Sequence, residues 1–86
     1  MTLAAWKRQV QVGTILRCIE NTYRPELNGT TRTMTKVGAT VAECESNGVS
    51  GFRMEWPKAR DVVRVDGSAI TYRIRGDYLV TLAVES

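Results

Sequence analysis

The segment Thr22-Tyr23-Arg24-Pro25-Glu26-Leu27-Asn28-Gly29-Thr30 is a polar loop around which the rest of the chain is organised. Its proline fixes one backbone dihedral, and its Asn-Gly pair has the backbone freedom of a tight turn. Residues 14–21 alternate as a strand does, and residues 30–37 are rich in β-prone threonine. We therefore expect the loop to join two paired strands and to project from a small barrel.

Further strand signals recur at intervals of about ten residues and are separated by turn signals. Asn47-Gly48 and Asp66-Gly67 suit tight hairpins, whereas Pro57 ends the strand before it because proline cannot donate to a ladder. One short helical turn is expected over residues 58–62. The remaining strand-like segments are residues 39–45, 51–56, 63–65, 69–74 and 78–84. This order predicts an all-β fold, in which five to six short antiparallel strands form a small barrel.

The chain of 86 residues is long enough for one small domain. We assign residues 13–86 to the barrel and residues 1–12 to an N-terminal arm. For this arm we favour an extended lead-in over a helical turn around residues 4–9, because Val10 and Val12 alternate with polar neighbours. Trp6 either anchors the arm on the barrel or presents an aromatic ring to a partner.

The cleanest alternation in the chain predicts part of the core. Phe52, Met54 and Trp56 share one face of residues 51–56, and charged side chains share the other. We expect Phe52→Ala or Trp56→Ala to cost about 3 to 5 kcal/mol as large-to-small changes in a small core. The two cysteines, Cys18 and Cys44, lie inside strand-like segments and are interpreted as small apolar core residues.

The composition argues against several functional classes. The chain has no histidine, and so lacks the commonest general base and metal ligand, and it has no glycine-rich phosphate loop. Glu43 and Glu45 share a strand face and are interpreted as solvated surface. We therefore predict no enzyme, no metal site and no cofactor. No apolar run approaches the roughly 20 residues of a membrane helix, and residues 6–8 are too polar for a signal peptide, so a cytoplasmic protein without membrane contact is expected.

The order of elements resembles that of small SH3-like barrels. Residues 21–32 and Trp56-Pro57-Lys58-Ala59, followed by the Asp-Gly hairpin, are similar to a group of small uncharacterised proteins encoded by actinobacterial phages and prophages. The resemblance covers about residues 13–84. It implies an SH3-like fold and a phage-related origin, hence a bacterial host cell, and it supplies no catalytic or binding residues.

Two classes of partner remain open. Trp, Tyr and Arg are favoured at the centres of protein interfaces, and SH3-like barrels commonly recruit extended peptides. A nucleic-acid surface instead needs basic residues interleaved with aromatic ones, and the net charge of +3 comes from interspersed signs that favour neither class. We expect a protein partner or a second copy of the chain, with nucleic acid as the alternative. The candidate partner-binding residues are Trp6, Tyr23, Arg24, Glu26, Arg32 and Arg53.

Overall fold

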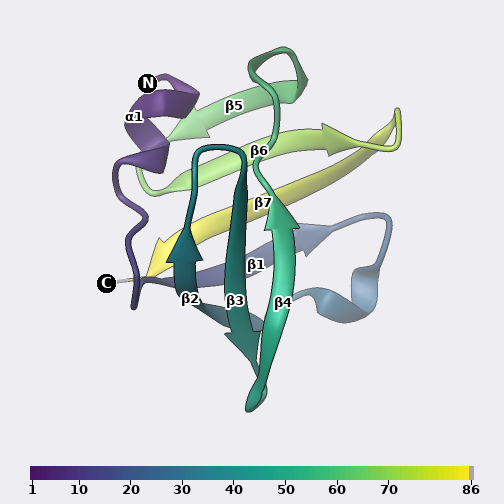
Figure 1. Ribbon diagram of the computed structural model, residues 1–86. Coiled ribbons are helices and arrows are strands. Elements are labelled where there is room, and N and C mark those ends of the chain that lie inside the picture. The colour runs from purple at the N-terminus through teal and green to yellow at the C-terminus, as the bar shows by residue number, and fades with distance from the viewer. Residues whose placement is uncertain (86) are drawn as a thin grey trace.

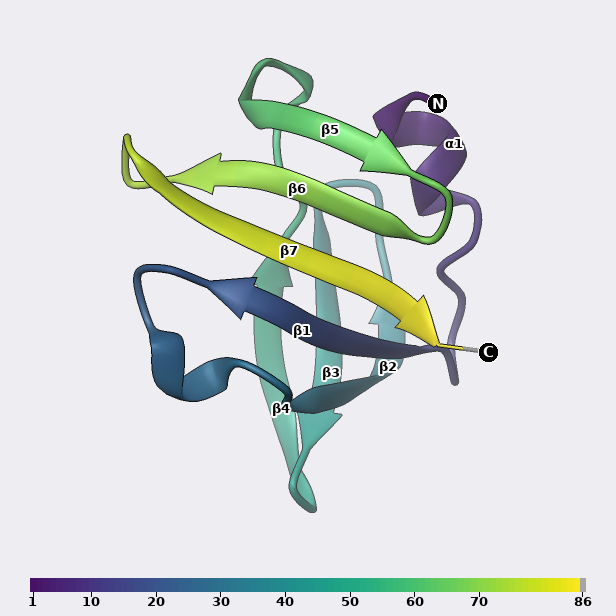
Figure 2. The ribbon, with the colours of Figure 1, turned by 180° about the vertical axis from the view of Figure 1, so that it is seen from behind.

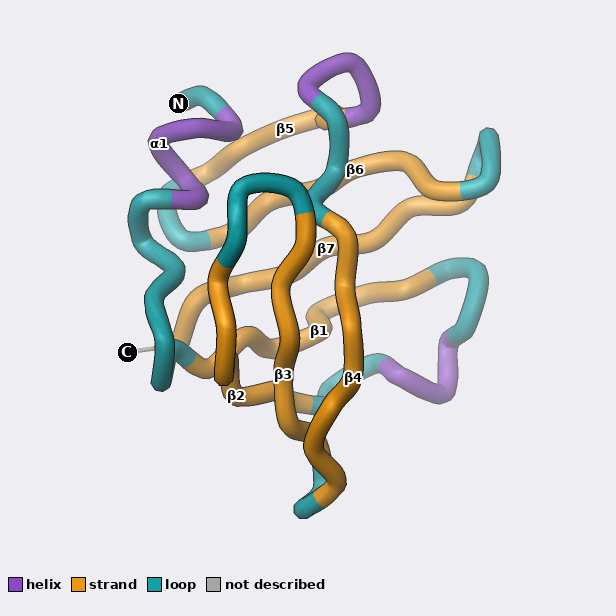
Figure 3. Tube along the Cα trace, in the orientation of Figure 1, coloured by secondary structure: helices purple, strands orange, loops and turns teal. Residues whose placement is uncertain are grey.

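The computed structural model describes residues 1–85 and contains one antiparallel sheet of seven strands (Figure 1). The strands are β1 (Ile15–Asn21), β2 (Thr31–Val37), β3 (Val41–Ser46), β4 (Val49–Glu55), β5 (Val62–Asp66), β6 (Ala69–Ile74) and β7 (Tyr78–Glu85). The helical segments are α1 (Leu3–Lys7) and two 3-10 turns, η1 (Pro25–Leu27) and η2 (Ala59–Asp61). Figure 3 shows that all three lie outside the sheet, at the N-terminus and in two connections.

The strand order is β4-β3-β2-β1-β7-β6-β5, and the sheet bends where β1 meets β2. Residues 15–17 of β1 pair with residues 31–33 of β2, and β2 pairs with β3 over residues 33–37, so β1 and β3 flank different parts of β2. As a result, β2, β3 and β4 cross over β1, β7, β6 and β5, as the two opposite views in Figures 1 and 2 show. The inner faces of these two halves of the sheet enclose the core.

The all-β, antiparallel prediction is confirmed, but the sheet has seven strands rather than five to six and does not close into a barrel. Its two edges, β4 and β5, do not pair with each other. In place of a closing ladder, Trp6 of α1 packs edge-to-face against Trp56 just after β4, with ring centroids 6.1 Å apart. The indole Nε1 of Trp6 donates a hydrogen bond to the Ser68 carbonyl in the β5–β6 turn, at 2.8 Å.

The N-terminal segment begins with a helix, so the preference for an extended arm is wrong. The side chain of Thr2 caps α1 by accepting a hydrogen bond from the Ala5 amide at 3.1 Å. Trp6 is 0 % exposed, whereas Val12 is 69 % exposed. The valine alternation was misleading because burying one large indole stabilises the segment more than burying a second valine would.

The buried side chains come from all parts of the sheet and from the N-terminal segment. They are Trp6, Val10, Leu16, Cys18, Met34, Ala42, Cys44, Met54, Trp56, Ile70, Tyr72, Val80 and Leu82. Both cysteines are buried and free, which confirms their interpretation as core residues. The expected helical turn over residues 58–62 corresponds to η2.

The core assignment of Phe52 is wrong, because this side chain is 50 % exposed. It lies on the same strand face as the buried Met54 and Trp56. However, the β3–β4 hairpin projects beyond the rest of the sheet at the bottom of Figure 1, and the second half of the sheet does not cover its tip. Phe52 belongs to β4 of this hairpin and follows Gly48 of its turn by four residues.

Candidate binding groove

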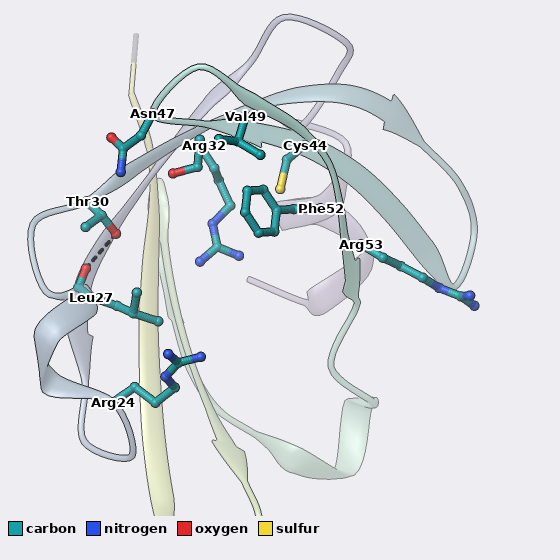
Figure 4. A pocket seen from close by; sticks show the side chains of 10 residues that line it. Arg24, Leu27, Thr30, Arg32, Cys44, Asn47, Val49, Phe52 and Arg53 are labelled. Carbon is teal, nitrogen blue, oxygen red and sulfur yellow. Dashed lines mark hydrogen bonds between the residues drawn. The ribbon is translucent and has the colours of Figure 1, made fainter.

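A groove of about 360 Å³ opens between the loop containing η1 and the projecting β3–β4 hairpin (Figure 4). We call it the hairpin groove. Its lining residues are Arg24, Leu27, Thr30, Arg32, Cys44, Ser46, Asn47, Val49, Phe52 and Arg53. One of its walls is the loop of residues 22–30, and the described residues that line it include three arginines and no carboxylate.

Side-chain hydrogen bonds hold the η1 wall of the groove in place. The buried Asn21 side chain accepts hydrogen bonds through Oδ1 from the backbone amides of Tyr23 and Arg24, at 3.0 and 2.8 Å. Oδ1 of Asn28 accepts from the Asn21 amide at 2.6 Å, and the Thr30 hydroxyl donates to the Leu27 carbonyl at 2.6 Å. These bonds replace the ladder that a strand would have, so the loop keeps a defined shape.

The hairpin forms the opposite wall. Asn47 and Gly48 adopt positive φ angles of 54° and 78°, which suits the tight turn between β3 and β4. Phe52 lies opposite Cys44 in the strand register and points into the groove in Figure 4. Together with Val49, which is 56 % exposed, it forms an apolar wall that faces solvent.

Arg32 of β2 is half-buried, and its guanidinium points into the middle of the groove (Figure 4). Its Nη1 lies 3.9 Å from the Met54 sulfur. Burial raises the pKa of Tyr72 to about 12, and the positive charge of Arg32 partly opposes this rise. Burial also raises the pKa values of the Cys18 and Cys44 thiols, and the positive charge of Arg32 partly offsets both rises.

Arg32 has no acidic partner in the part of the chain that the structure describes. Ion pairs there join Arg17 to Glu85, Arg24 to Glu26 and Lys36 to Glu43. The Arg24–Glu26 pair is exposed, with Nε and Oε2 3.2 Å apart. A hydrogen bond from its own backbone amide and the contact with Arg24 hold the pKa of Glu26 below its ordinary value.

The candidate residues from the sequence therefore separate into three groups. Arg24, Arg32 and Arg53 line the groove, although Figure 4 shows the Arg53 guanidinium pointing away from it, and Glu26 pairs with Arg24. Tyr23 is not among the lining residues and is 41 % exposed. Its ring packs against the Tyr78 ring, with centroids 4.9 Å apart. The Arg75 guanidinium carbon lies over the Tyr23 ring, 4.9 Å from its centroid.

Trp6, the remaining candidate, does not belong to this surface. Its side chain is fully buried between the two halves of the sheet, so the structure corrects its assignment as a partner contact. Of the two roles considered for it, the anchor matches its position. The physical reason is the helical conformation of residues 3–7, which turns the indole inward.

Phe52 and Val49 are groove residues that the sequence reasoning missed. A signal was available, because Phe52 follows the Asn47-Gly48 turn by only four residues and so lies near the tip of its hairpin. Leu27, an apolar residue in an otherwise polar loop, is partly buried against the core and also lines the groove.

The chemistry of the groove lining follows from its side chains. Its polar groups are guanidinium, hydroxyl and amide groups, and the Cys44 thiol has a raised pKa that disfavours the reactive thiolate. Within residues 1–85, no group of three or more His, Cys, Asp and Glu side chains is arranged to hold a metal ion. The same residues contain no helix that is long and apolar enough to cross a membrane.

Comparison with protein-family models, with curated proteins and with solved structures finds no match to this chain.

Proposed function

We propose that the protein is a non-catalytic interaction module whose hairpin groove binds an extended segment of another protein. The exposure of Phe52 is the observation that carries the proposal. Leaving a phenylalanine half in water forgoes part of the roughly 1.5 to 3 kcal/mol that full burial contributes. An exposed aromatic ring beside Val49 and two arginines has the composition of an interface centre.

The size of the groove favours a narrow ligand. A volume of about 360 Å³ is at the lower end of the range for ligand pockets, which is about 300 to 1,000 Å³. It has room for a few side chains of an extended segment but not for a folded surface. The wall formed by the hairpin is a strand, and strands are the usual platform for extended peptides.

Nucleic acid is the second candidate, and one observation favours it. The groove lining has three arginines and no carboxylate, and a base could stack on Phe52, where stacking is worth about 1 to 3 kcal/mol per base. Two facts weigh against it. Glu26 already pairs with Arg24, and the Arg53 guanidinium points away, which leaves Arg32 as the cation of the groove without an acidic partner among residues 1–85.

The two candidates differ in how they respond to salt and to Phe52→Ala. We expect peptides selected from a random 12-residue display library on the full chain to lose binding with Phe52→Ala. They should keep it with Val63→Ala, which changes an exposed apolar residue outside the groove. Single-stranded oligonucleotides of mixed sequence should not bind at low salt. Oligonucleotide binding that weakens steeply as salt rises would favour the second candidate.

A second copy of the chain is the other protein partner that we consider. Light scattering over a range of concentrations tests it directly, because self-association through the groove would raise the mass of the wild type but not of Phe52→Ala. A constant monomer mass would exclude a second copy of the chain as the partner.

The SH3-like relationship, the phage-related origin and action in the cytoplasm of a bacterial host are proposals that rest on the motifs of residues 21–32 and 56–59. Genes for related chains that lie beside phage structural genes would support this origin. Related chains encoded only in unrelated chromosomal operons would contradict it.

A further inference from the structure

We propose that the segment bound in the hairpin groove is acidic, and that it adds to the sheet as a strand along β4 with one carboxylate beside Arg32. This inference rests on the proposed function and specifies the chemistry of the ligand and its mode of binding.

The first step is the free edge of β4. This strand stands at one end of the sheet, and within residues 1–85 it pairs with β3 alone. The Trp56 amide donates to the Thr40 carbonyl of the neighbouring chain segment at 3.0 Å. Because hydrogen-bonding direction alternates along a strand, Met54 also faces β3, whereas Arg53 and Glu55 direct their amide and carbonyl groups to the free edge.

The second step is the position of this edge beside the groove. Phe52 and Arg53 of β4 both line the groove, so a strand added to β4 would run along its mouth. Alternate side chains of such a strand point to the same face as Phe52 and therefore into the groove. The other edge strand, β5, lacks this arrangement, because none of its residues lines the groove.

The third step is charge. Arg32 is half-buried and makes no ion pair with any carboxylate in residues 1–85, whereas Arg24, which also lines the groove, is paired with Glu26. A guanidinium binds a carboxylate through two parallel charge-assisted hydrogen bonds. A carboxylate beside Arg32 could therefore accept two hydrogen bonds from its guanidinium, at a site where the core excludes water on one side.

These steps predict a pattern in the bound segment. Residues two positions apart share a face of a strand, so an acidic residue beside Arg32 places an apolar residue two positions away against Phe52 or Leu27. The expected motif is an Asp or Glu and an apolar residue separated by one residue of any type.

Peptide selection tests the motif. A random 12-residue display library is selected on the full chain, and the enriched peptides are then titrated against the variants. We expect the acidic-x-apolar motif to be enriched, and binding to weaken about tenfold or more with Arg32→Gln. The matched control is Arg64→Gln, which changes an exposed arginine outside the groove and should leave the affinity unchanged. If Arg32→Gln fails to fold, Arg32→Lys keeps the charge, removes the paired donors and should still weaken binding.

Amide exchange tests the binding mode in the same complexes. In the free protein the amides of Arg53 and Glu55 should exchange rapidly with solvent, and the bound peptide should protect both. Two peptides, methylated at odd-numbered or at even-numbered backbone nitrogens, should differ. The one that has lost the amides donating to β4 should not bind, and the other should bind.

The outcomes separate this inference from the proposed function. Enriched peptides that lack acidic residues but still require Phe52 would overturn the inference and leave the function standing. Binding without protection of the Arg53 and Glu55 amides would overturn strand addition. If no peptide is enriched, both proposals fail, and binding of the mixed oligonucleotides would then assign the groove to nucleic acid.

Discussion

At the scale of single residues, the groove is a continuation of the core. Met34 on β2 is buried, and Arg32, two residues away on the same face, lies in the groove. Met54 on β4 is buried as well, and Phe52, two residues away, lies in the groove. Both strands thus pass from the core to the groove within one alternation of the strand.

The first prediction compares two aromatic residues of the same strand face. Trp56→Ala should destabilise the protein by about 3 to 5 kcal/mol, because it opens a cavity between α1 and the sheet. Phe52→Ala should destabilise it by about 1 kcal/mol, because half of that side chain is already in water. Urea denaturation measures both values. Equal losses would show that Phe52 contributes to the core despite its exposure.

The residue faces were predictable from the sequence, whereas the depth of each residue was not. Alternation correctly placed Phe52, Met54 and Trp56 on one side of a strand. Whether that face is covered depends on how far the second half of the sheet extends over it. A local sequence pattern carries no information on that extent. The same limit explains Trp6, whose burial depends on a turn some sixty residues away along the chain.

The second prediction concerns Tyr72 and high pH. Burial raises the pKa of its phenol from 10.0 to about 12, so the unfolded chain loses this proton first as the pH rises. The contribution of Tyr72 to stability is therefore complete below pH 10 and is lost as the pH rises from 10 towards 12.

Urea midpoints at several pH values should show this loss in the wild type and a smaller loss in Tyr72→Phe. The two buried cysteines titrate in both proteins, so their effect cancels in the comparison. The same dependence on pH in both proteins would show that the Tyr72 phenol is not held neutral by burial.

At the scale of elements, the two walls of the groove are stabilised differently. The hairpin wall is a ladder between β3 and β4, which continues into the core at Met54. The η1 wall depends on side chains that bond to backbone groups, above all on the buried amide of Asn21. Local opening of the groove is therefore expected to begin at η1 rather than at the hairpin.

The third prediction follows from this difference. Asn21→Ala removes the acceptor of two backbone amides and should cost about 1 to 3 kcal/mol, since those amides lose their partner. It should also speed amide exchange at Tyr23 and Arg24 and weaken binding in the groove. Gln11→Ala, which truncates an exposed side chain of similar polarity, serves as the control. Unchanged exchange at both amides would mean that other contacts order the loop.

The loop itself was predictable, but its role as a wall was not. Pro25 and Asn28-Gly29 correctly indicated a turn between two paired strands. The groove arises because this loop faces the tip of a hairpin from another part of the chain. Turn signals describe local backbone shape, so they cannot indicate which distant hairpin a loop will face.

At the scale of the whole molecule, the open sheet is held together where its two halves meet at α1. Trp6 reaches Trp56 beside β4 and the Ser68 carbonyl beside β5, and Lys7 Nζ donates to the Ala39 carbonyl in the β2–β3 turn at 2.7 Å. A five-residue helix is too short to be stable alone, so α1 requires these contacts with the sheet in order to form.

The last prediction is that the two halves unfold together, because one core spans both and α1 joins them. The fluorescence of Trp6 and Trp56 reports the α1 contact, and far-ultraviolet circular dichroism reports the sheet. The two should give the same urea midpoint.

Trp6→Ala should lower the midpoint that both probes report and reduce the free energy of unfolding by about 3 to 5 kcal/mol. Trp56 then remains as the fluorophore. Arg8→Ala, an exposed change just after the helix, should leave both midpoints unchanged. If Trp6→Ala instead shifts only the fluorescence transition, the helix docks onto a sheet that is stable without it, and closure of the open side contributes little to the fold.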